Sequence, residues 1–208
     1  MSQIKDLEQG IALPIMEDFY SVQGEAFHTG TPSYFIRIGG CDVGCHWCDV
    51  KESWNAALHP VTPVREVIDR MPEHTKTVII TGGEPLEYNL NLLTKLIREK
   101  GIQTHLETSG THPVSGQWDW ICLSPKKFKP PVLSLYPLAD ELKIIVRNKS
   151  DFAFAEKEAE KVSPYTRHLF LQPEWSVHET ITPVIIEYIK RNPHWKLSVQ
   201  LHKFLKIP

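Results

Sequence analysis

The sequence has no long apolar run, no excess of either charge and few cysteines. No stretch approaches the roughly 18 apolar residues of a membrane span, and the polar start MSQIKDLEQG does not resemble a signal peptide. A formal net charge of -2 argues against a basic face that binds nucleic-acid phosphates. We therefore expect a cytoplasmic protein that binds neither membranes nor nucleic acids.

The few cysteines are concentrated at one place. Four cysteines in 208 residues make a poor disulfide framework, which favours a reducing compartment. Three of them lie in CDVGCHWCDV, residues 41–50, whereas Cys122 lies far along the chain. Cys41, Cys45 and Cys48 follow the spacing C-x3-C-x2-C. Three thiolates at this spacing can face one point and leave a fourth position there to be filled.

Short apolar segments alternate with helical patterns along the chain. The segments that indicate buried strands are residues 33–39, 77–83, 104–110, 119–124, 141–146 and 168–173. Helical patterns run from Thr62-Pro63 to about residue 70, over about 90–100 and about 151–162, and from Thr182-Pro183 onward. This alternation predicts an α/β fold with a mostly parallel sheet.

The length of the chain limits the architecture. A full eight-fold β/α barrel takes about 250 residues, so six or seven strands in 208 residues predict an incomplete barrel, one domain over residues 1–208. In such folds the active site lies at the carboxyl ends of the strands. The loop 40–50 follows the first expected strand, and GGEP, TSG, SPK and QPEW follow later ones. We therefore expect these segments to share one edge.

Three interpretations of the cysteine loop can be compared. Soft thiolates select zinc, Cu(I) or iron–sulfur clusters. A structural zinc site needs four protein ligands, and His46 would have to supply the fourth from the same short loop. Unligated cysteines are usually isolated and apolar, unlike these. An iron–sulfur cubane with three thiolates leaves one iron open, which suits a catalyst. We therefore expect a 4Fe–4S cluster.

The motifs resemble those of a known superfamily. C-x3-C-x2-C with Trp47 before its last cysteine resembles the radical S-adenosylmethionine (SAM) enzymes, and TGGEP at 81–85 resembles their second signature. Residues 19–49, FYSVQGEAFHTGTPSYFIRIGGCDVGCHWCD, are similar to the opening of the 7-carboxy-7-deazaguanine synthases. ETSGT, SPK, ELKIIV, LQPEW and the final QLHKFLKIP also resemble that family. The resemblance covers essentially the whole chain.

The resemblance implies a fold, a reaction and partners. It implies a partial barrel and a homodimer that converts 6-carboxy-5,6,7,8-tetrahydropterin to 7-carboxy-7-deazaguanine, with ring contraction and loss of ammonia, in deazapurine (queuosine) biosynthesis. An electron donor such as flavodoxin or ferredoxin would reduce the cluster, and SAM would yield a 5'-deoxyadenosyl radical and be regenerated. Cys41, Cys45 and Cys48 would hold three irons, and SAM would chelate the fourth.

The resemblance also implies binding residues. Those at SAM would be Trp47, Asp49, Gly83, Glu84, Ser124, Pro125, Lys126, Gln172, Pro173, Glu174 and Trp175. Glu84 would pair with the SAM ammonium, and Gly83 would let the backbone approach it. The alternatives are that GGEP is only a turn, that Lys126 lies in a solvated loop and that Trp175 caps a core.

Substrate contacts would come from both ends of the chain. The expected residues are Val22, Gln23, Gly24, Glu25, Arg37, Thr81 and Pro208, with His202 as a weaker candidate and the tail 200–208 closing the site. Gln23 and Glu25 offer acceptors to the guanidine-like edge of a pterin. Arg37 can bind a carboxylate through two hydrogen bonds.

The sequence departs from the family pattern at two positions. Ala26 replaces the last glycine of QGEG, and Val50 replaces a Ser or Thr whose hydroxyl would ligate Mg²⁺. The valine side chain has no oxygen, so the ion would need ligands from the substrate, from water, or from a neighbour such as Asp49 or Glu52, or the reaction needs no metal.

Two rival functions share the cysteine loop: an activase that places a glycyl radical on a partner protein, and a zinc-stabilised binding module.

Overall fold

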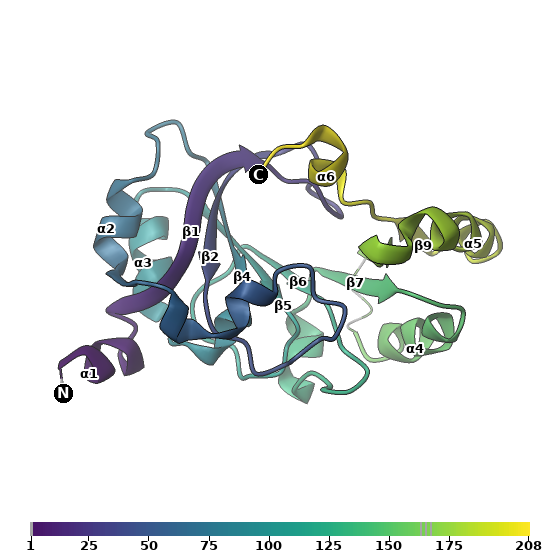
Figure 1. Ribbon diagram of the computed structural model, residues 1–208, viewed down its shortest axis with the longest axis horizontal. Helices are drawn as coiled ribbons and strands as arrows, with labels where there is room; N and C mark the ends of the chain where they lie inside the picture. Colours follow the sequence, from purple (N-terminus) through teal and green to yellow (C-terminus); the bar gives the residue numbers. More distant parts are fainter. Residues whose placement is uncertain (1, 163, 165, 167) are drawn as a thin grey trace.

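The protein folds into a single curved sheet with helices on its outer side (Figure 1). The computed structural model describes residues 2–162, 164, 166 and 168–208. The strands are β1 (Ala12–Val22), β2 (Pro32–Ile38), β3 (Val61–Pro63), β4 (Thr77–Gly82), β5 (Gln103–Thr108), β6 (Trp120–Leu123), β7 (Glu141–Val146), β8 (His168–Pro173) and β9 (Trp195–Leu197). The helices are α1 (Ser2–Glu8), α2 (Val64–Asp69), α3 (Asn91–Glu99), α4 (Ser150–Ala159), α5 (His178–Arg191) and α6 (Leu201–Leu205).

The sheet is parallel except at one edge. Its order is β3-β1-β2-β4-β5-β6-β7-β8-β9, and β1 runs antiparallel to both β2 and β3. The remaining neighbours are parallel, and no pairing among the described residues closes β9 onto β3. The expected incomplete β/α barrel is therefore confirmed, with nine strands and not the six or seven expected from the sequence.

Successive side chains along each strand point alternately to the outer core and to the interior of the barrel. Ile36, Ile80 and Leu142 point outward and pack under the helices with full burial. Because successive strand residues face opposite sides, their neighbours Arg37, Thr81 and Lys143 point inward and line a cavity. The outer core has two parts, one beneath α2 and α3 and one beneath α4 and α5.

Two expected helix starts are wrong. Thr62 and Pro63 lie in β3, paired with β1, and the helix begins one residue later at Val64. The fourth helix begins at His178 and not at Thr182, because the 3-10 turn η5 (Trp175–Val177) leads directly into it. Pro183 thus lies inside α5. No helix within the described part of the chain is long and apolar enough to cross a membrane.

Candidate active site

A cavity of about 460 Å³ opens at the carboxyl ends of the parallel strands. The expected residues that line it are Val22, Gln23, Gly24, Glu25, Arg37, Cys41, Cys45, Trp47, Cys48, Asp49, Thr81, Gly83, Glu84, Ser124, Lys126, Gln172, Pro173, Glu174, Trp175 and Pro208. His202, the weaker candidate, lines it too. Pro125 does not line this cavity, although both of its neighbours do. The structure therefore brings the two groups of expected binding residues to one place.

The cysteine loop is open enough for a group larger than zinc. Across the described residues, the only group of three His, Cys, Asp or Glu with ligand atoms all within 4.8 Å is Asp42, Glu87 and His112. At least one pair of the three cysteine sulfurs therefore lies more than 4.8 Å apart, wider than the ~3.8 Å that tetrahedral zinc with bonds of about 2.3 Å imposes. His46 instead lies 2.7 Å from Arg147 Nη1 on the outer side. The donor set fits an iron–sulfur cluster and not a Cys3His zinc site.

Backbone contacts fix the cysteine loop against the GGEP turn. Gly83 N donates to Ile38 O at 2.8 Å, and Glu84 N donates to Gly40 O at 2.9 Å. A Cβ atom on Gly83 would lie 1.9 Å from Gly40 O, so only glycine fits there. The close approach that requires Gly83 is therefore made by the protein's own backbone. Its contact with SAM stays a prediction.

Glu84 is held by protein donors on both carboxylate oxygens. Oε1 accepts hydrogen bonds from Leu86 N at 3.1 Å and Thr108 Oγ1 at 2.5 Å. Oε2 accepts from Ser109 N at 2.8 Å and from the Ser109 hydroxyl. The residue is only 1% exposed, so the carboxylate cross-links the GGEP turn to the end of β5. GGEP is thus a structured turn, and the contact of Glu84 with the SAM ammonium stays a prediction.

Lys126 does not lie in a solvated loop. Its Nζ donates to Ser124 O at 2.6 Å and to Ser124 Oγ at 2.7 Å, and it lies 5.6 Å from the ring centroid of Trp47. Burial lowers the pKa of Lys126, and a negative charge on Cys45 would raise it by a smaller amount. Trp175 also lines the cavity, stacked on His178 at 4.2 Å. The structure therefore rejects the solvated-loop interpretation of Lys126 and places Trp175 at the cavity.

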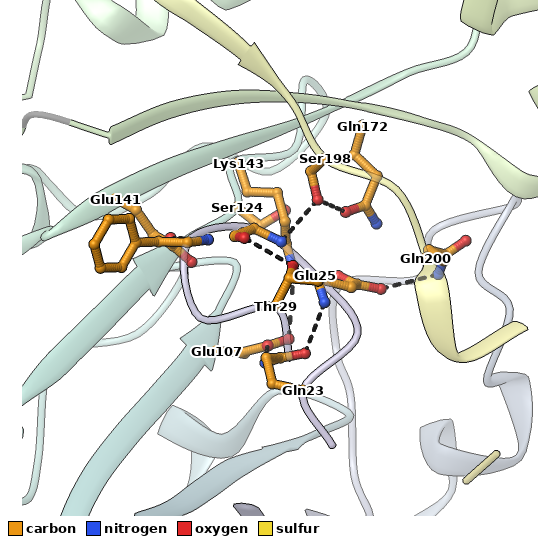
Figure 2. A network of polar contacts seen from close by, with 12 residues as sticks. Gln23, Glu25, Thr29, Glu107, Ser124, Glu141, Lys143, Gln172, Ser198 and Gln200 are labelled. Carbon is orange, nitrogen blue, oxygen red and sulfur yellow. Dashed lines mark hydrogen bonds and ion pairs between the residues drawn. The ribbon is translucent and has the colours of Figure 1, made fainter. Parts of the chain in front are cut away.

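A buried network lies at the other end of the cavity, where Gln23, Glu25, Glu107, Lys143 and Gln200 point toward one another (Figure 2). Lys143 Nζ forms an ion pair with Glu25 and lies 3.4 Å from Glu107 Oε2. Gln23 Nε2 donates to Glu107 Oε1 at 2.8 Å, and Gln200 Nε2 donates to Glu25 Oε1 at 3.1 Å. One ammonium is thus shared between two carboxylates.

The charges in this network support one another. Burial raises the pKa of Glu25, but the Lys143 ammonium, with smaller contributions from His202 and Gln200, holds that pKa below its usual range. Burial lowers the pKa of Lys143, whereas Cys122, Glu107 and Glu25 raise it far more. Sequence reasoning assigned no role to Glu107 or Lys143. The available signal for Lys143 was a charged residue inside the apolar run KIIV of β7, whereas β5, QTHLET, is mostly polar and offered no such signal for Glu107.

Arg37 and the C-terminal tail close the substrate end. Arg37 Nε lies 3.2 Å from Glu17 Oε1, and its guanidinium lies 5.6 Å from the Phe19 ring centroid. The tail meets β1 and the loop after it, because Ser21 Oγ donates to Pro208 O at 3.1 Å and Leu201 N donates to Gly24 O at 2.9 Å (Figure 1). The tail therefore forms part of the cavity wall.

The side chains around position 50 do not form a magnesium site. Val50 lines the cavity, and its carbonyl accepts a hydrogen bond from Ser53 Oγ at 2.7 Å. The Asp49 carboxylate is paired with Lys203 and accepts from Gln200 Nε2 at 2.9 Å. Glu52, the other expected ligand, does not line the cavity. The Val50 carbonyl and the Asp49 carboxylate are thus already bound to protein partners, and Glu52 lies outside the cavity. These oxygens do not fit Mg²⁺, which needs oxygen ligands in octahedral positions around it.

Comparison with known proteins agrees with this geometry. Residues 35–125 match the family model described as the radical SAM superfamily. The chain is 55% identical over 97% of its length to a 7-carboxy-7-deazaguanine synthase from Flavobacterium psychrophilum, covering 96% of that protein. It is 35% identical over 93% of its length to the enzyme of that name from Escherichia coli K12, covering 98% of that protein.

A solved structure shows the same fold. The crystal structure of QueE from Escherichia coli superposes with a TM-score of 0.78 at 33% identity, covering 97% of this chain and 99% of that one. Identity at this level over nearly the whole of both chains is decisive, and it agrees with the three-cysteine loop at the mouth of a partial barrel. The chain belongs to the 7-carboxy-7-deazaguanine synthase family of radical SAM enzymes.

Proposed function

We propose that the protein converts 6-carboxy-5,6,7,8-tetrahydropterin to 7-carboxy-7-deazaguanine, with ring contraction and loss of ammonia. The observation that carries this proposal is a single cavity with three cysteines at one end and the Lys143 network at the other. A bound cluster and SAM would supply a radical at the first end. The second end offers ionised acceptors to a small heterocycle.

The residues at the cluster end hold and shield the cofactors. Cys41, Cys45 and Cys48 would bind three irons of a 4Fe–4S cluster, and SAM would complete it. When bound, these groups supply one-electron cleavage of SAM and reversible removal of hydrogen from the substrate. Trp47 and Lys126 lie beside the cysteines and would limit the access of water.

The residues at the other end would select the pterin. Its guanidine-like edge donates hydrogen bonds, and Glu107 and Glu25 are acceptors beside the Lys143 ammonium. Arg37 lines the same space and would bind the substrate carboxylate. Thr81 and the end of the chain at Pro208 would complete the pocket.

The same proposal includes a cytoplasmic homodimer and a small electron-transfer protein as its reductant. These features come from the resemblance to the family. Magnesium stays a prediction to which we assign no step, because the donors around Val50 do not fit it.

The test is anaerobic incubation of the reconstituted protein with SAM, dithionite and the pterin, with and without Mg²⁺, and detection of product by mass. Formation of 7-carboxy-7-deazaguanine is the expected result. Cleavage of SAM with the pterin untouched would contradict the proposed substrate and favour the activase. A colourless protein that leaves SAM intact would favour the zinc-stabilised module.

A further inference from the structure

Gln200 joins the two ends of the cavity through one amide group. Its Nε2 donates to Glu25 Oε1 at 3.1 Å and to Asp49 Oδ2 at 2.9 Å. Glu25 belongs to the loop after β1 and pairs with Lys143, whereas Asp49 follows the last residue of the three-cysteine motif. An amide nitrogen carries two hydrogens, so Gln200 holds both carboxylates at the same time. The same side chain therefore touches the end expected to bind SAM and the end expected to bind the pterin.

Ser198 makes a second connection of the same kind. Its hydroxyl donates to Gln172 Oε1 at 2.7 Å (Figure 2) and accepts a hydrogen bond from Ala26 N at 2.9 Å. Gln172 is one of the residues expected at SAM, and Ala26 follows Glu25 in the loop after β1. Ser198 and Gln172 are each only 2% exposed. This connection is therefore shielded from water, where a hydrogen bond is stronger than at the surface.

The segment that carries these two side chains is attached on both sides. Its backbone meets the loop after β1, because Leu201 N donates to Gly24 O at 2.9 Å. Its Lys203 forms an ion pair with Asp49 beside the cysteine loop. We call residues 198–203 the bridging segment. A displacement of either loop is carried to the other through this segment, because hydrogen bonds and an ion pair join it to both.

We propose that Gln200 is a positioning residue that couples the binding of SAM to the binding of the pterin. This inference rests on the proposed function, because it takes SAM and the pterin as the two ligands. SAM held by Asp49 and Gln172 restrains the bridging segment, and the segment then holds Glu25 in place. The pterin meets a site that is already ordered, so each ligand binds more tightly when the other is present.

Three variants test the coupling. Gln200→Met has nearly the same length but donates to neither carboxylate, whereas Gln200→Lys keeps a donor for both. Gln103→Met is the matched control, because Gln103 is exposed at the amino end of β5, opposite the cavity. The reconstituted protein is kept anaerobic and without reductant, so that SAM is not cleaved. The Kd of SAM is then measured by equilibrium dialysis with and without saturating pterin.

We expect the pterin to lower the Kd of SAM by about tenfold in the wild type, in Gln200→Lys and in Gln103→Met, and by about twofold or less in Gln200→Met. A merely structural role would raise the Kd of both ligands and leave this ratio unchanged. A ratio near one in a wild type that binds the pterin would overturn the proposal. So would an undiminished ratio in Gln200→Met, or a ratio in Gln200→Lys as low as that of Gln200→Met.

Hydrogen exchange separates this inference from the proposed function. SAM alone should slow the exchange of backbone amides in residues 22–26 of the wild type and not in Gln200→Met, because the effect passes through the bridging segment and needs no pterin. A pterin that does not bind, with this protection present, would contradict the proposed substrate while supporting the role of Gln200. Absence of the protection from the wild type would overturn that role.

Discussion

Gln23 Nε2 donates to Glu107 Oε1 at 2.8 Å, while the other oxygen of this carboxylate lies 3.4 Å from Lys143 Nζ. Glu107 is therefore held from two sides by residues that lie far away in the sequence. Because Gln23 belongs to the loop after β1 and Lys143 belongs to β7, the contact links two distant parts of the barrel. An acceptor held in this way keeps its direction when a ligand arrives, which favours specific binding.

Lys143→Met should weaken both stability and pterin binding. The substitution leaves Glu25 and Glu107 without their shared cation, and removing one partner of a buried ion pair costs about 3 kcal/mol or more. We expect the free energy of unfolding of the apoprotein to fall by about this amount in urea titrations. Pterin binding in equilibrium dialysis with SAM should become undetectable.

The control and the rescue for this variant use nearby residues. Lys196→Met on β9 removes an exposed lysine and should change neither quantity. Glu25→Gln combined with Lys143→Met removes one of the two stranded carboxylates, so it should recover part of the lost stability. A double variant no more stable than Lys143→Met would contradict the shared-cation interpretation.

His105 should make the apoprotein less stable in mild acid. Burial, followed by the charge of His28, lowers the pKa of His105 to about 4, against which Asp119 acts weakly. The unfolded chain therefore binds more protons than the folded protein below about pH 6.5, and stability falls as the pH drops toward about 4. We expect a loss of about 1 kcal/mol between pH 7.5 and 5.5 in urea titrations.

The variant His105→Gln isolates this effect. It should remove part of the change with pH, whereas His194→Gln, at an exposed histidine, should keep the full change. His28 packs 4.5 Å from His105 between ring centroids and has a pKa lowered by burial, so it contributes in the same direction. An unchanged slope in His105→Gln would show that His105 is not the titrating group.

Ala26→Gly should stabilise the protein. Ala26 has φ of +53°, in the left-handed region, where a residue with a Cβ atom costs about 1 to 2 kcal/mol. The greater freedom of glycine in the unfolded chain offsets part of this gain, by about 0.4 to 1 kcal/mol. We expect a net gain of about 0.5 kcal/mol in urea titrations, and Ala153→Gly inside α4 should destabilise instead.

Val50→Thr should introduce a response to magnesium. Val50 lines the cavity without offering an oxygen, so we expect Mg²⁺ to change wild-type product formation less than about twofold. The threonine hydroxyl supplies one ligand, and the substrate and water supply the others. Val50→Ala, which also lacks an oxygen, is the matched control. Strong Mg²⁺ dependence of the wild type would show that another residue binds the ion.

Six of the parallel strands could be predicted because most of them are short apolar runs, and all six are present within a few residues of their expected bounds. The strand β1 was missed because only its first part is buried and its pairing with β2 shifts between Ile15 and Glu17. The short edge strands β3 and β9 carry too few residues to show a period. The start of α5 was misplaced because Pro183, a common first residue of helices, lies inside it.

The candidate site was predictable where its chemistry is local in the sequence. The three cysteines and GGEP are contiguous motifs, so they could be found in the sequence, and together they carry the resemblance that predicts the group they bind. Glu107 and Lys143 act through contacts with the loop after β1, which depend on the folded sheet. The hydrogen bonds that Thr108 and Ser109 donate to Glu84 likewise come from the end of β5 and could not be predicted from the GGEP turn itself.

Gly24→Ala should weaken pterin binding through the tail. A Cβ atom on Gly24 would lie 2.4 Å from His202 Nδ1 and 2.8 Å from His202 N, so α6 must shift away from the cavity. We expect about a tenfold loss of pterin affinity, the size of one charge-assisted hydrogen bond. Proteolysis within residues 200–208 should become faster at the same time.

A second variant separates the clash from loss of the tail. Lys203→Met removes the ion pair with Asp49 and the contact of Lys203 with the Trp175 ring at 4.8 Å, without adding bulk. It should reproduce the loss of pterin affinity and the faster proteolysis. Gly101→Ala is the control for a glycine replacement outside the tail: a Cβ atom there meets nothing within 4 Å, and its φ of +72° should lower the stability of the protein without changing pterin affinity or proteolysis of the tail. If the tail loosens in Lys203→Met while pterin affinity is unchanged, α6 does not form part of the binding site.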